Sequence, residues 1–408
     1  MNVLLSVGVN KSRYTEGDVP VPDSVMSLLA NITGGKSYKA HKYGLDHAER
    51  PYIDYGEDSI VWLETAETTH HRKYVSLELK SKQVAESNEQ LLTYFLDGSR
   101  RVFKVDDISY PFSGGRSVIY PVIAGQIGVG CTKRVRKKLT CEKFKQEFVI
   151  SMPIIANADG KSGFFPATAQ KLNSIPALQA LGIRFSTILP YDTSRSNDKK
   201  FEDKGTACIQ DRMIEQEKKM VAELVREGKL NQDNYLIKDG SLEYRPIKED
   251  RADRQRYQRF RQNYNWVLGV SKNFNPEICK DINGKSNPGY IADLPLYHRT
   301  PVACFKNLEL FGDVKFAVWY VRIREKSRTR TPFDGVLKIE KMLVTSEEME
   351  YGIDSELVDT LTALIINERC PTCYGSDLRW ANHLYPVYLT ESFVKSKYLS
   401  TESFLNLF

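Results

Sequence analysis

The sequence has no hydrophobic run long enough to cross a membrane. No stretch of the 408 residues approaches the roughly 18 uninterrupted apolar residues of a membrane-spanning helix. The opening, MNVLLSVGVNKSRY, has too short an apolar run, and no basic start, for a secretory signal. We therefore expect a cytoplasmic protein with no membrane association.

The sequence also lacks the Gly-x-x-x-x-Gly-Lys-(Ser/Thr) loop that cradles nucleotide phosphates. This absence excludes an ATP motor of that type within the chain. If the protein moves along a polymer, we expect a partner to supply the energy.

Cysteines do not form a metal-binding pattern. The seven cysteines are odd in number and mostly lie in apolar segments, which is typical of reduced thiols. Cys370 and Cys373 form a Cys-x-x-Cys pair, but a structural zinc site needs a second pair, and Cys279 and Cys304 stand alone. The sequence therefore predicts a turn with incidental thiols at this pair.

The composition is that of an ordinary globular protein. A chain of 408 residues with 41% hydrophobic content can bury a large core, as one elaborated domain or two interlocked ones. The net charge of +6 is modest, but its distribution is uneven. One basic cluster, KRVRKK, spans residues 133–138, and a second, RPIKEDRADRQRYQRFR, spans residues 245–261.

Both basic clusters are candidates for binding a nucleic-acid backbone. Guanidinium groups contact phosphates, and the interleaved Tyr257 and Phe260 can stack on exposed bases. The candidate contacts are Lys137, Arg251, Arg254, Arg256 and Arg259. The alternative is a solvated helix face, because acids within the second cluster can pair locally with its arginines.

An Asp-Gly-Ser tripeptide occurs twice, at residues 97–99 and 239–241, each time after an apolar, strand-like run. The sequence predicts that each aspartate lies where a buried strand gives way to a glycine turn. Two such aspartates can face each other across adjacent strands, where a divalent cation would relieve their repulsion. Each tripeptide taken singly is also a good turn and nothing more.

Residues 206–227 predict a long helix that ends at Gly228. Its apolar residues form one stripe, and Glu217 falls near the middle of that stripe, whereas Glu215 and Glu223 point away. A carboxylate in a buried stripe is costly without a cation or a partner. A salt bridge, or a side chain that reaches outward, is the structural alternative.

The elements therefore run from hairpin strands that begin with an aspartate, through a helix with a glutamate, to a strand that ends in an aspartate. This is the order of metal ligands in the ribonuclease H-like fold, so we expect an α/β protein with a mixed sheet flanked by helices. Three carboxylates in this arrangement can hold two divalent ions roughly 3.5–4 Å apart and promote hydrolysis of a phosphodiester.

At this point the chain resembles the NurA nucleases, which act with the hexameric HerA translocase in processing DNA ends. The matching segments are YFLDGSR at 94–100, DRMIEQEKKMVAEL at 211–224, YLIKDGSL at 235–242, VLGVSK at 267–272, FAVWYVRI and DGVLKIE within 316–340, and LYPVYLTESF at 384–393. The resemblance implies a DNA nuclease that is dimeric and docked on a HerA-type ATPase.

The resemblance also implies that Asp97, Glu217 and Asp239 bind catalytic Mn²⁺ or Mg²⁺. The helix offers Asp211 and Glu215 as alternatives, and the choice of Glu217 rests on helix geometry. Lys272 matches a lysine that the family places near the site, where its ammonium group can contact the scissile phosphate. A solvated lysine at the end of a strand is the alternative.

The fourth ligand departs from the family pattern. A His or Asp is expected on the last helix, a few residues beyond a Tyr-Pro turn, but Tyr385-Pro386 is followed by Leu389, Thr390, Glu391 and Ser392. His383, just before the turn, and Glu391, on the helix, are the two replacements, and we place His383 slightly ahead.

The chain divides into residues 1–90, an N-terminal extension with a tentative docking or dimer-forming role, and residues 91–408, the nuclease domain. Within the second part we expect a meander of antiparallel strands over YFLDGSRRVFKV, SVIYPVIAGQIGVG and EFVISMPII, between residues 94 and 155, a short helix at 167–181 and a polar loop, SRSNDKKFEDKG, at 194–205.

The predicted function is metal-dependent DNA cleavage in DNA end processing or in defence against foreign DNA. Two alternatives remain. One is a different ribonuclease H-like nuclease of the PIWI type, although the sequence offers no guide-anchoring domain. The other is a degenerate nuclease fold that binds DNA or the ATPase without cutting, which the irregular fourth ligand favours.

Overall fold

A computed structural model of the protein describes residues 24–45, 60–87, 90–194, 200–242, 261–279, 285–306, 315–371 and 381–408. The helices in these ranges are α1 (Val25–Thr33), α2 (Glu78–Ser87), α3 (Phe164–Leu172), α4 (Pro176–Ala180), α5 (Phe201–Arg226), α7 (Pro288–Ala292), α8 (Ser346–Tyr351), α9 (Ser355–Asn367), α10 (Tyr385–Lys395) and α11 (Thr401–Leu405).

The strands in the same ranges are β1 (Lys36–Ser37), β2 (Tyr43–Gly44), β3 (Ile60–Thr65), β4 (Val75–Ser76), β5 (Leu92–Pro111), β6 (Ser117–Val135), β7 (Lys138–Pro153), β8 (Phe185–Tyr191), β9 (Tyr235–Asp239), β10 (Val267–Ser271), β11 (His298–Arg299), β12 (Ala303–Lys306), β13 (Lys315–Arg322) and β14 (Val336–Met342).

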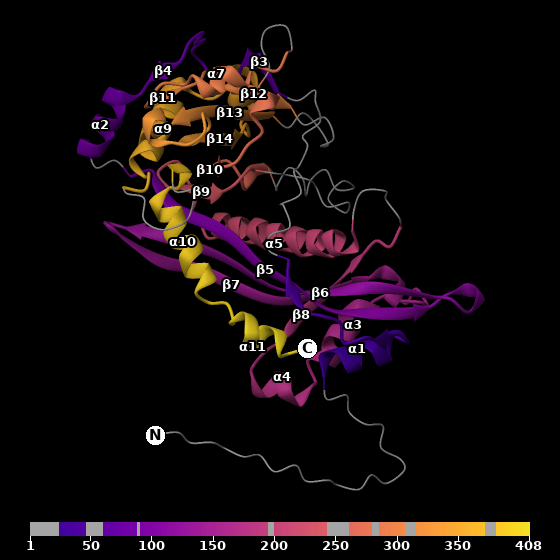
Figure 1. Ribbon diagram of the computed structural model, residues 1–408. Coiled ribbons are helices and arrows are strands. Elements are labelled where there is room, and N and C mark those ends of the chain that lie inside the picture. Colours follow the sequence, from indigo (N-terminus) through magenta and orange to yellow (C-terminus); the bar gives the residue numbers. More distant parts are fainter. Residues whose placement is uncertain are drawn as a thin grey trace.

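These strands form one mixed sheet with the order β3-β12-β13-β14-β10-β9-β5-β6-β7-β8. The strands β5, β6 and β7 are an antiparallel meander, as the sequence predicts for residues 94–155, although β7 ends at Pro153. The strand β9 runs parallel to β5 on its other side, and β10 runs parallel to β9. The expected mixed α/β architecture is confirmed, with α5 connecting the meander side of the sheet to β9 (Figure 1).

Helix α5 confirms the predicted helix and extends it. It begins at Phe201, five residues before the predicted start, so the FEDKG part of the expected polar loop is helical. It ends before Gly228, whose φ of 68° is the left-handed conformation that glycine adopts most easily. Among the described residues no helix is both long and apolar enough to serve as a membrane span.

The predicted single helix at 167–181 is wrong, because the segment forms two short helices, α3 and α4. The break falls at residues 173–175, and Pro176 occupies the first turn of α4. Proline has no backbone N–H to donate within a helix but fits the first helical position.

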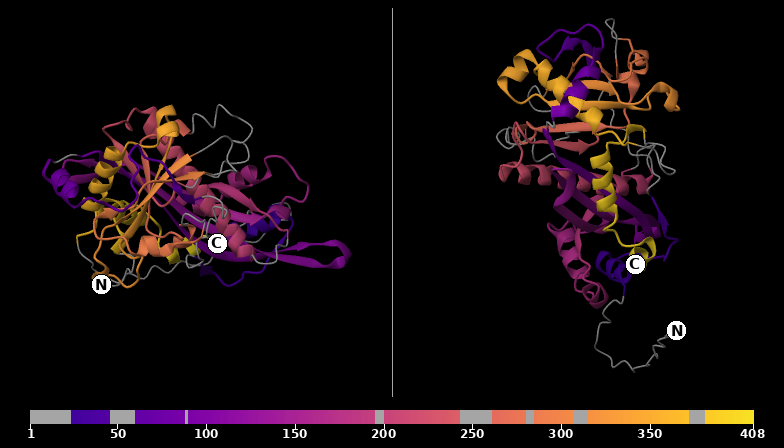
Figure 2. Two further views of the ribbon diagram at one scale, coloured as in Figure 1. Left: turned by 90° about the horizontal axis from the view of Figure 1, so that it is seen from above. Right: turned by 90° about the vertical axis from the view of Figure 1, so that its left-hand side faces the viewer.

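Helices α5 and α10 cover opposite faces of the central strands. A Cβ atom added to Gly125 of β6 would lie 3.2 Å from the side chain of Ile209 on α5. A Cβ atom at Gly130, on the same strand, would lie 2.5 Å from Val394 on α10. Residues an odd number apart on a strand point to opposite faces, so glycines let both helices pack closely on β6. Figures 1 and 2 show both helices beside the long β5–β7 strands.

Residues before position 91 take part in the same sheet. Strands β1 and β2 pair with β5, and β3 pairs with β12 at the far edge. The docking or dimer-forming role of residues 1–90 stays a prediction.

Candidate active site

The first Asp-Gly-Ser lies inside a strand, so the predicted turn at residues 97–99 is wrong. Strand β5 continues without interruption to Pro111. The glycine has a different use: a Cβ atom at Gly98 would lie 2.3 Å from Oε1 of Glu217. Glycine at this position therefore leaves the space in which the Glu217 carboxylate of α5 lies against the strand.

Asp97 points to the face of β5 opposite Gly98, because neighbouring strand residues alternate. The residue is 5% exposed, and its Oδ2 has no hydrogen-bond partner among the described residues. Burial raises the pKa of Asp97 well above its usual range, and the charges of Asp239, Glu391 and Glu217 raise it further, while Lys272 opposes them. This carboxyl group is thus in an electrostatically unfavourable place.

Glu217 is the buried acid of α5, and it lies beside Gly98 on the face of β5 opposite Asp97. The residue is 3% exposed. Its alternatives lie elsewhere: Asp211 is exposed, and Glu215 pairs with Arg212 at 2.7 Å and with Lys219 at 2.6 Å. Burial within the apolar stripe, which the helical periodicity predicts, is therefore confirmed for Glu217.

Lys238 is a neighbour of Glu217 that the sequence reasoning missed. Its Nζ lies 3.0 Å from Oε2 of Glu217, an ion pair whose angles fall outside those of a hydrogen bond, since that oxygen has no hydrogen-bond partner among the described residues. The same Nζ donates to the carbonyl oxygens of Asp239, at 3.0 Å, and Ser241, at 3.3 Å. A lysine in the otherwise apolar run YLIKD was the signal in the sequence.

The second Asp-Gly-Ser forms the predicted turn. Asp239 is the last residue of β9, and Gly240 has a φ of 85°. Because β9 pairs in parallel with β5, with Leu96 opposite Lys238, Asp97 and Asp239 lie on neighbouring strands at the same level. The two tripeptides therefore meet, as the sequence predicts, although only one of them is a turn.

Glu340 of β14 anchors this turn. Its Oε2 accepts hydrogen bonds from Oγ of Ser241 and from the backbone N–H of Leu242, both at 2.6 Å. Burial raises the pKa of Glu340, but its ion pair with Lys338 and these two donors outweigh burial, so the pKa is lowered. Three charged residues within the otherwise apolar run VLKIEKM marked this anchor, and the sequence reasoning did not use them.

Lys272, directly after β10, lies among the acids rather than in solvent. Its Nζ is 2.9 Å from Oδ2 of Asp239 and 3.9 Å from Oε2 of Glu391. Burial alone lowers the pKa of Lys272, but the charges of Asp239, Glu391 and Asp97 raise it above the usual value. The lysine is therefore held as a cation.

Glu391 is the residue of α10 that approaches Lys272. Burial raises its pKa, but Lys272 and Lys395 outweigh burial, so the carboxylate stays charged. His383, placed slightly ahead on sequence grounds, is buried with 2% exposure, and its ring lies edge-on to Tyr388, 5.6 Å between centroids. Of the two candidates, Glu391 is the one whose contacts join it to Lys272. We call Asp97, Glu217, Asp239 and Glu391 the acid cluster.

The acid cluster is not a ready-made set of metal ligands. Among the described residues, no three carboxylate, imidazole or thiol side chains converge as metal ligands do. Lysine ammonium groups lie beside two of the carboxylates instead, Lys238 beside Glu217 and Lys272 beside Asp239. The negative charges of these carboxylates stabilise the two ammonium groups and would stabilise any other cation beside them.

The predicted nucleic-acid contacts are only in part described. Arg251, Arg254, Arg256 and Arg259 lie outside the described residues. Lys137 is exposed in the turn between β6 and β7, next to Arg136, whose φ is 58°. Their role in binding DNA stays a prediction.

Comparison with known proteins gives one structural likeness to report. No protein-family model matches the chain, and no curated protein matches it. A crystal structure of the NurA nuclease from Sulfolobus solfataricus is similar with a TM-score of 0.38 and 11% sequence identity, over 81% of this chain and 92% of that chain. A likeness at this level carries no argument about activity.

Proposed function

We propose that this protein is a metal-dependent deoxyribonuclease whose active centre is the acid cluster. The observation that carries the proposal is a pair of buried carboxylate oxygens, Oδ2 of Asp97 and Oε2 of Glu217, without hydrogen-bond partners among the described residues. Buried polar atoms are almost always satisfied. Oε2 of Glu217 has an ion pair with Lys238, whereas Oδ2 of Asp97 lies among other acids without such a partner, which is costly for folding. Such a cost is typical of a functional site.

The proposed ligands of a divalent ion are carboxylates, whose oxygens Mg²⁺ and Mn²⁺ prefer. Asp97 and Asp239 would hold the metal from one face of the sheet, and Glu217, which lies beside Gly98 on the other face, would have to turn toward them. A bound pair of such ions would supply an activated water and stabilise the leaving oxygen of a phosphodiester. Gly98 supports this assignment, because a side chain there would occupy the space of the Glu217 carboxylate.

The remaining residues of the site would bind and orient the substrate. Lys272, kept cationic by its acidic neighbours, would contact a phosphate oxygen. Glu391 would keep Lys272 in position from α10, 3.9 Å away. Glu340 would fix Asp239 indirectly, because it anchors the turn that follows.

The proposed partners are DNA, a HerA-type hexameric ATPase and a second copy of the chain. Support comes from the sequence resemblance and from the missing nucleotide-phosphate loop. Deletion of residues 1–90 would remove β3 from the sheet edge, so truncation before α1 is the better test of docking. If the truncated and complete proteins associate equally with the ATPase, the part of residues 1–90 that precedes α1 has no docking role.

A second candidate function is a non-cutting subunit that binds DNA or the ATPase. The ion pairs of Lys238 with Glu217 and of Lys272 with Asp239 favour it, because they neutralise two of the acids without any metal.

The test is cleavage of linear and single-stranded DNA in Mn²⁺, with and without a HerA-type partner. We compare the unmutated protein with Asp97→Ala and Asp239→Ala. We expect both variants to lose about a thousandfold or more in rate, since metal ions supply several kcal/mol of transition-state stabilisation. Asp233→Ala is the control, because Asp233 is exposed in the turn that precedes β9.

Calorimetric titration with Mn²⁺ gives a readout that does not depend on cleavage. Mn²⁺ binding that Asp97→Ala abolishes, together with cleavage, supports the nuclease. If the unmutated protein neither binds Mn²⁺ nor cuts DNA with the partner present, the non-cutting subunit is the correct function.

A further inference from the structure

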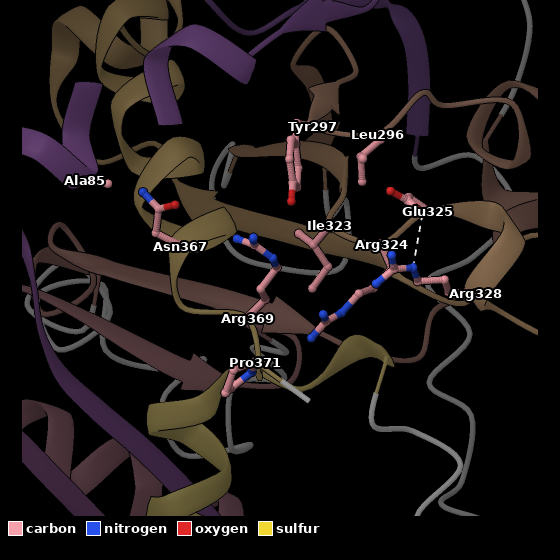
Figure 3. Close-up of a pocket in the computed structure, with 10 residues that line it drawn as sticks. All are labelled: Ala85, Leu296, Tyr297, Ile323, Arg324, Glu325, Arg328, Asn367, Arg369 and Pro371. Carbon is pink, nitrogen blue, oxygen red and sulfur yellow. Dashed lines mark ion pairs between the residues drawn. The ribbon is translucent and has the colours of Figure 1, made fainter. Parts of the chain in front are cut away.

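A cavity lies apart from the acid cluster, beside the ends of β13 and α9. The cavity has a volume of about 570 Å³, within the usual range of small-molecule sites. Its wall includes Leu296, Tyr297, Ile323, Arg324, Arg328 and Arg369. Figure 3 shows these side chains around a common space, with the arginines coming from two different segments.

The charge of the cavity wall is strongly positive. Three arginines line it, against one acid, Glu325, which pairs with Arg328 at 3.1 Å. Burial lowers the pKa of Arg324, and the charge of Arg369 lowers it further, so these two guanidinium groups repel each other. An anion between them would remove that repulsion.

Arg369 is held in a fixed orientation at the cavity. Its guanidinium lies 5.2 Å from the ring centroid of Tyr297 and donates to the carbonyl oxygen of Ile366 at 2.7 Å. Tyr297 has a φ of 53°, a strained conformation for a residue with a side chain. Strained residues of this kind cluster at ligand sites, and a pre-oriented guanidinium loses little freedom on binding an anion.

We infer that this cavity binds a nucleotide through a terminal phosphate. Arg324 and Arg369 would grip the phosphate oxygens, because the planar guanidinium matches phosphate geometry with two parallel donors. The apolar part of the wall, with Leu296 and Ile323, would contact the nucleoside. The volume is larger than a phosphate alone requires, so the ligand is a phosphate with an organic group attached.

The cavity backs onto the segment that carries Lys272. Nδ2 of Asn382 donates to the carbonyl oxygen of Lys272 at 2.8 Å, and Oδ1 of Asn382 accepts from the backbone N–H of Gly335. Gly335 in turn packs against Arg324, since a Cβ atom there would lie 2.5 Å from Cβ of Arg324. The nucleotide can therefore be free or can be the phosphorylated end of a DNA strand that reaches the acid cluster.

The experiment measures binding in EDTA with the full-length protein, so it does not depend on cleavage. Calorimetry compares dAMP with deoxyadenosine, and fluorescence anisotropy compares a short single-stranded oligonucleotide with a 5′-phosphate or a 5′-hydroxyl. The variants are Arg369→Gln and Arg324→Gln. Arg330→Gln is the matched control, because Arg330 is exposed on the same segment and does not line the cavity.

We expect a preference for the phosphorylated ligand that falls about tenfold or more in both variants, the effect of losing a charge-assisted hydrogen bond. The control should bind as the unmutated protein does.

Binding of dAMP indicates a free nucleotide, whereas preference for the phosphorylated oligonucleotide alone indicates a strand end. Both results support the proposed ligand site in the cavity. If Arg369→Gln fails to fold, Arg369→Lys, which keeps the charge but loses the paired donors, should weaken binding several-fold. Equal binding of phosphate and hydroxyl ligands, or equal binding by variants and unmutated protein, overturns the inference.

Discussion

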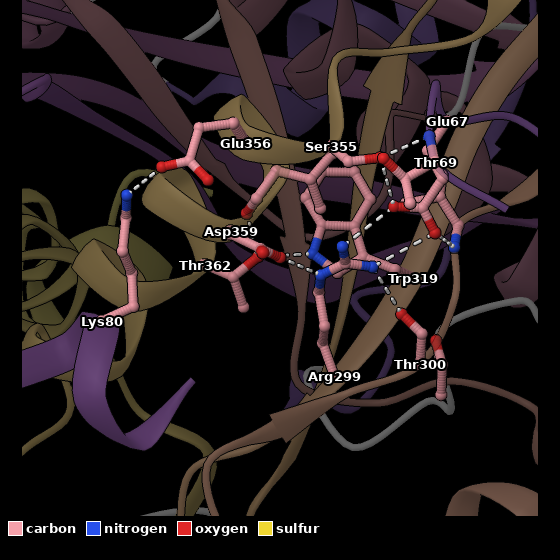
Figure 4. A network of polar contacts seen from close by, with 12 residues as sticks. Glu67, Thr69, Lys80, Arg299, Thr300, Trp319, Ser355, Glu356, Asp359 and Thr362 are labelled. Atoms are coloured by element: carbon pink, nitrogen blue, oxygen red, sulfur yellow. Dashed lines mark hydrogen bonds and ion pairs between the residues drawn. The ribbon is translucent and has the colours of Figure 1, made fainter. Parts of the chain in front are cut away.

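Among the buried groups of charged side chains in the described residues, two differ in how their polar atoms are satisfied. In the first, which we call the paired network, Glu67, Arg299, Ser355 and Asp359 join the segment after β3 to β11 and α9 (Figure 4). The Glu67 carboxylate accepts from Arg299 at 2.9 and 3.3 Å, from Ser355 at 3.1 Å and from the backbone N–H of Val302 at 2.9 Å.

The second group is the acid cluster, in which like charges meet and two carboxylate oxygens lack hydrogen bonds to the described residues. Both groups are buried, so burial alone does not identify a functional site. A network that satisfies its own charges needs no ligand. In the acid cluster two acids pair with lysines, but Oδ2 of Asp97 has no hydrogen-bond partner among the described residues, and this difference is the physical reason for the proposed chemistry.

The paired network gives the largest expected change in stability. Arg299→Met would leave the Glu67 carboxylate buried without its cation, at a cost of about 3–5 kcal/mol in the free energy of unfolding. Urea denaturation measures this loss. The control is Lys80→Met, which breaks the Lys80–Glu356 pair at the surface and should cost no more than about 1 kcal/mol. Equal effects of the two substitutions would show that the buried pair is no stronger than the exposed one.

The double variant Arg299→Met with Glu67→Leu sharpens this comparison. When both charges are replaced by apolar groups, much of the stability should return, because no charge is left buried. A double variant as unstable as Arg299→Met would mean that the network acts through shape and not through charge.

Gly98→Ala should have the next largest effect. The added methyl group would lie 2.3 Å from Oε1 of Glu217, so strand or helix must shift, at about 1–3 kcal/mol. The shift also displaces an acid of the cluster, so we expect weaker Mn²⁺ binding by calorimetry. In the double variant with Glu217→Ala, stability should return while Mn²⁺ binding does not. Additive losses in the two variants would contradict the proposed contact.

Lys238→Met tests whether the lysine competes with a metal ion. Removing its Nζ, 3.0 Å from Oε2 of Glu217, leaves the acid cluster more negative. We expect Mn²⁺ to bind about tenfold more tightly, which corresponds to about 1.4 kcal/mol. Lys229→Met, which breaks pairs outside the acid cluster with Glu142 and Glu227, is the control. Weaker Mn²⁺ binding would instead make Lys238 a supporting part of the site.

The sequence predicted the elements of the site better than its contacts. The meander, helix α5 and the turn at Asp239 follow from periodicity and from glycine, because these signals are local. The true use of Gly98 depends on a helix more than 100 residues further along the chain, so no local pattern reveals it.

The same reason explains Lys238 and Glu340. Each is a charged residue in a largely apolar strand, and only the folded contacts show that Lys238 lies beside Glu217 and that Glu340 holds the turn after Asp239. The paired network could not be predicted from the sequence either, since Glu67 and Arg299 are 232 positions apart. The cavity proposed to bind a phosphate combines Arg324 with Arg369, and no sequence pattern predicts that these two residues meet.

The pH dependence of Asp97 should change stability with the opposite sign to Arg299→Met. The folded protein raises the pKa of Asp97 well above its ordinary 3.8, so the folded state binds this proton more tightly than the unfolded state. Stability is therefore gained as the pH falls through the raised pKa towards 3.8 and is lost as the pH rises through it. Asp97→Asn removes this titration, so it should stabilise the protein near neutral pH and above, by about 1.4 kcal/mol for each unit of raised pKa.

The gain from Asp97→Asn should shrink as the pH approaches 3.8, and urea denaturation across that range measures it. Asp233→Asn, at an exposed acid, should show no such change. Mn²⁺ should reduce the difference in stability between Asp97→Asn and the unmutated protein. The ion stabilises the folded unmutated protein in proportion to its binding and cannot do so without Asp97. A loss of stability in Asp97→Asn at every pH would place Asp97 with the satisfied residues of the paired network, and the proposed metal site would lose its main support.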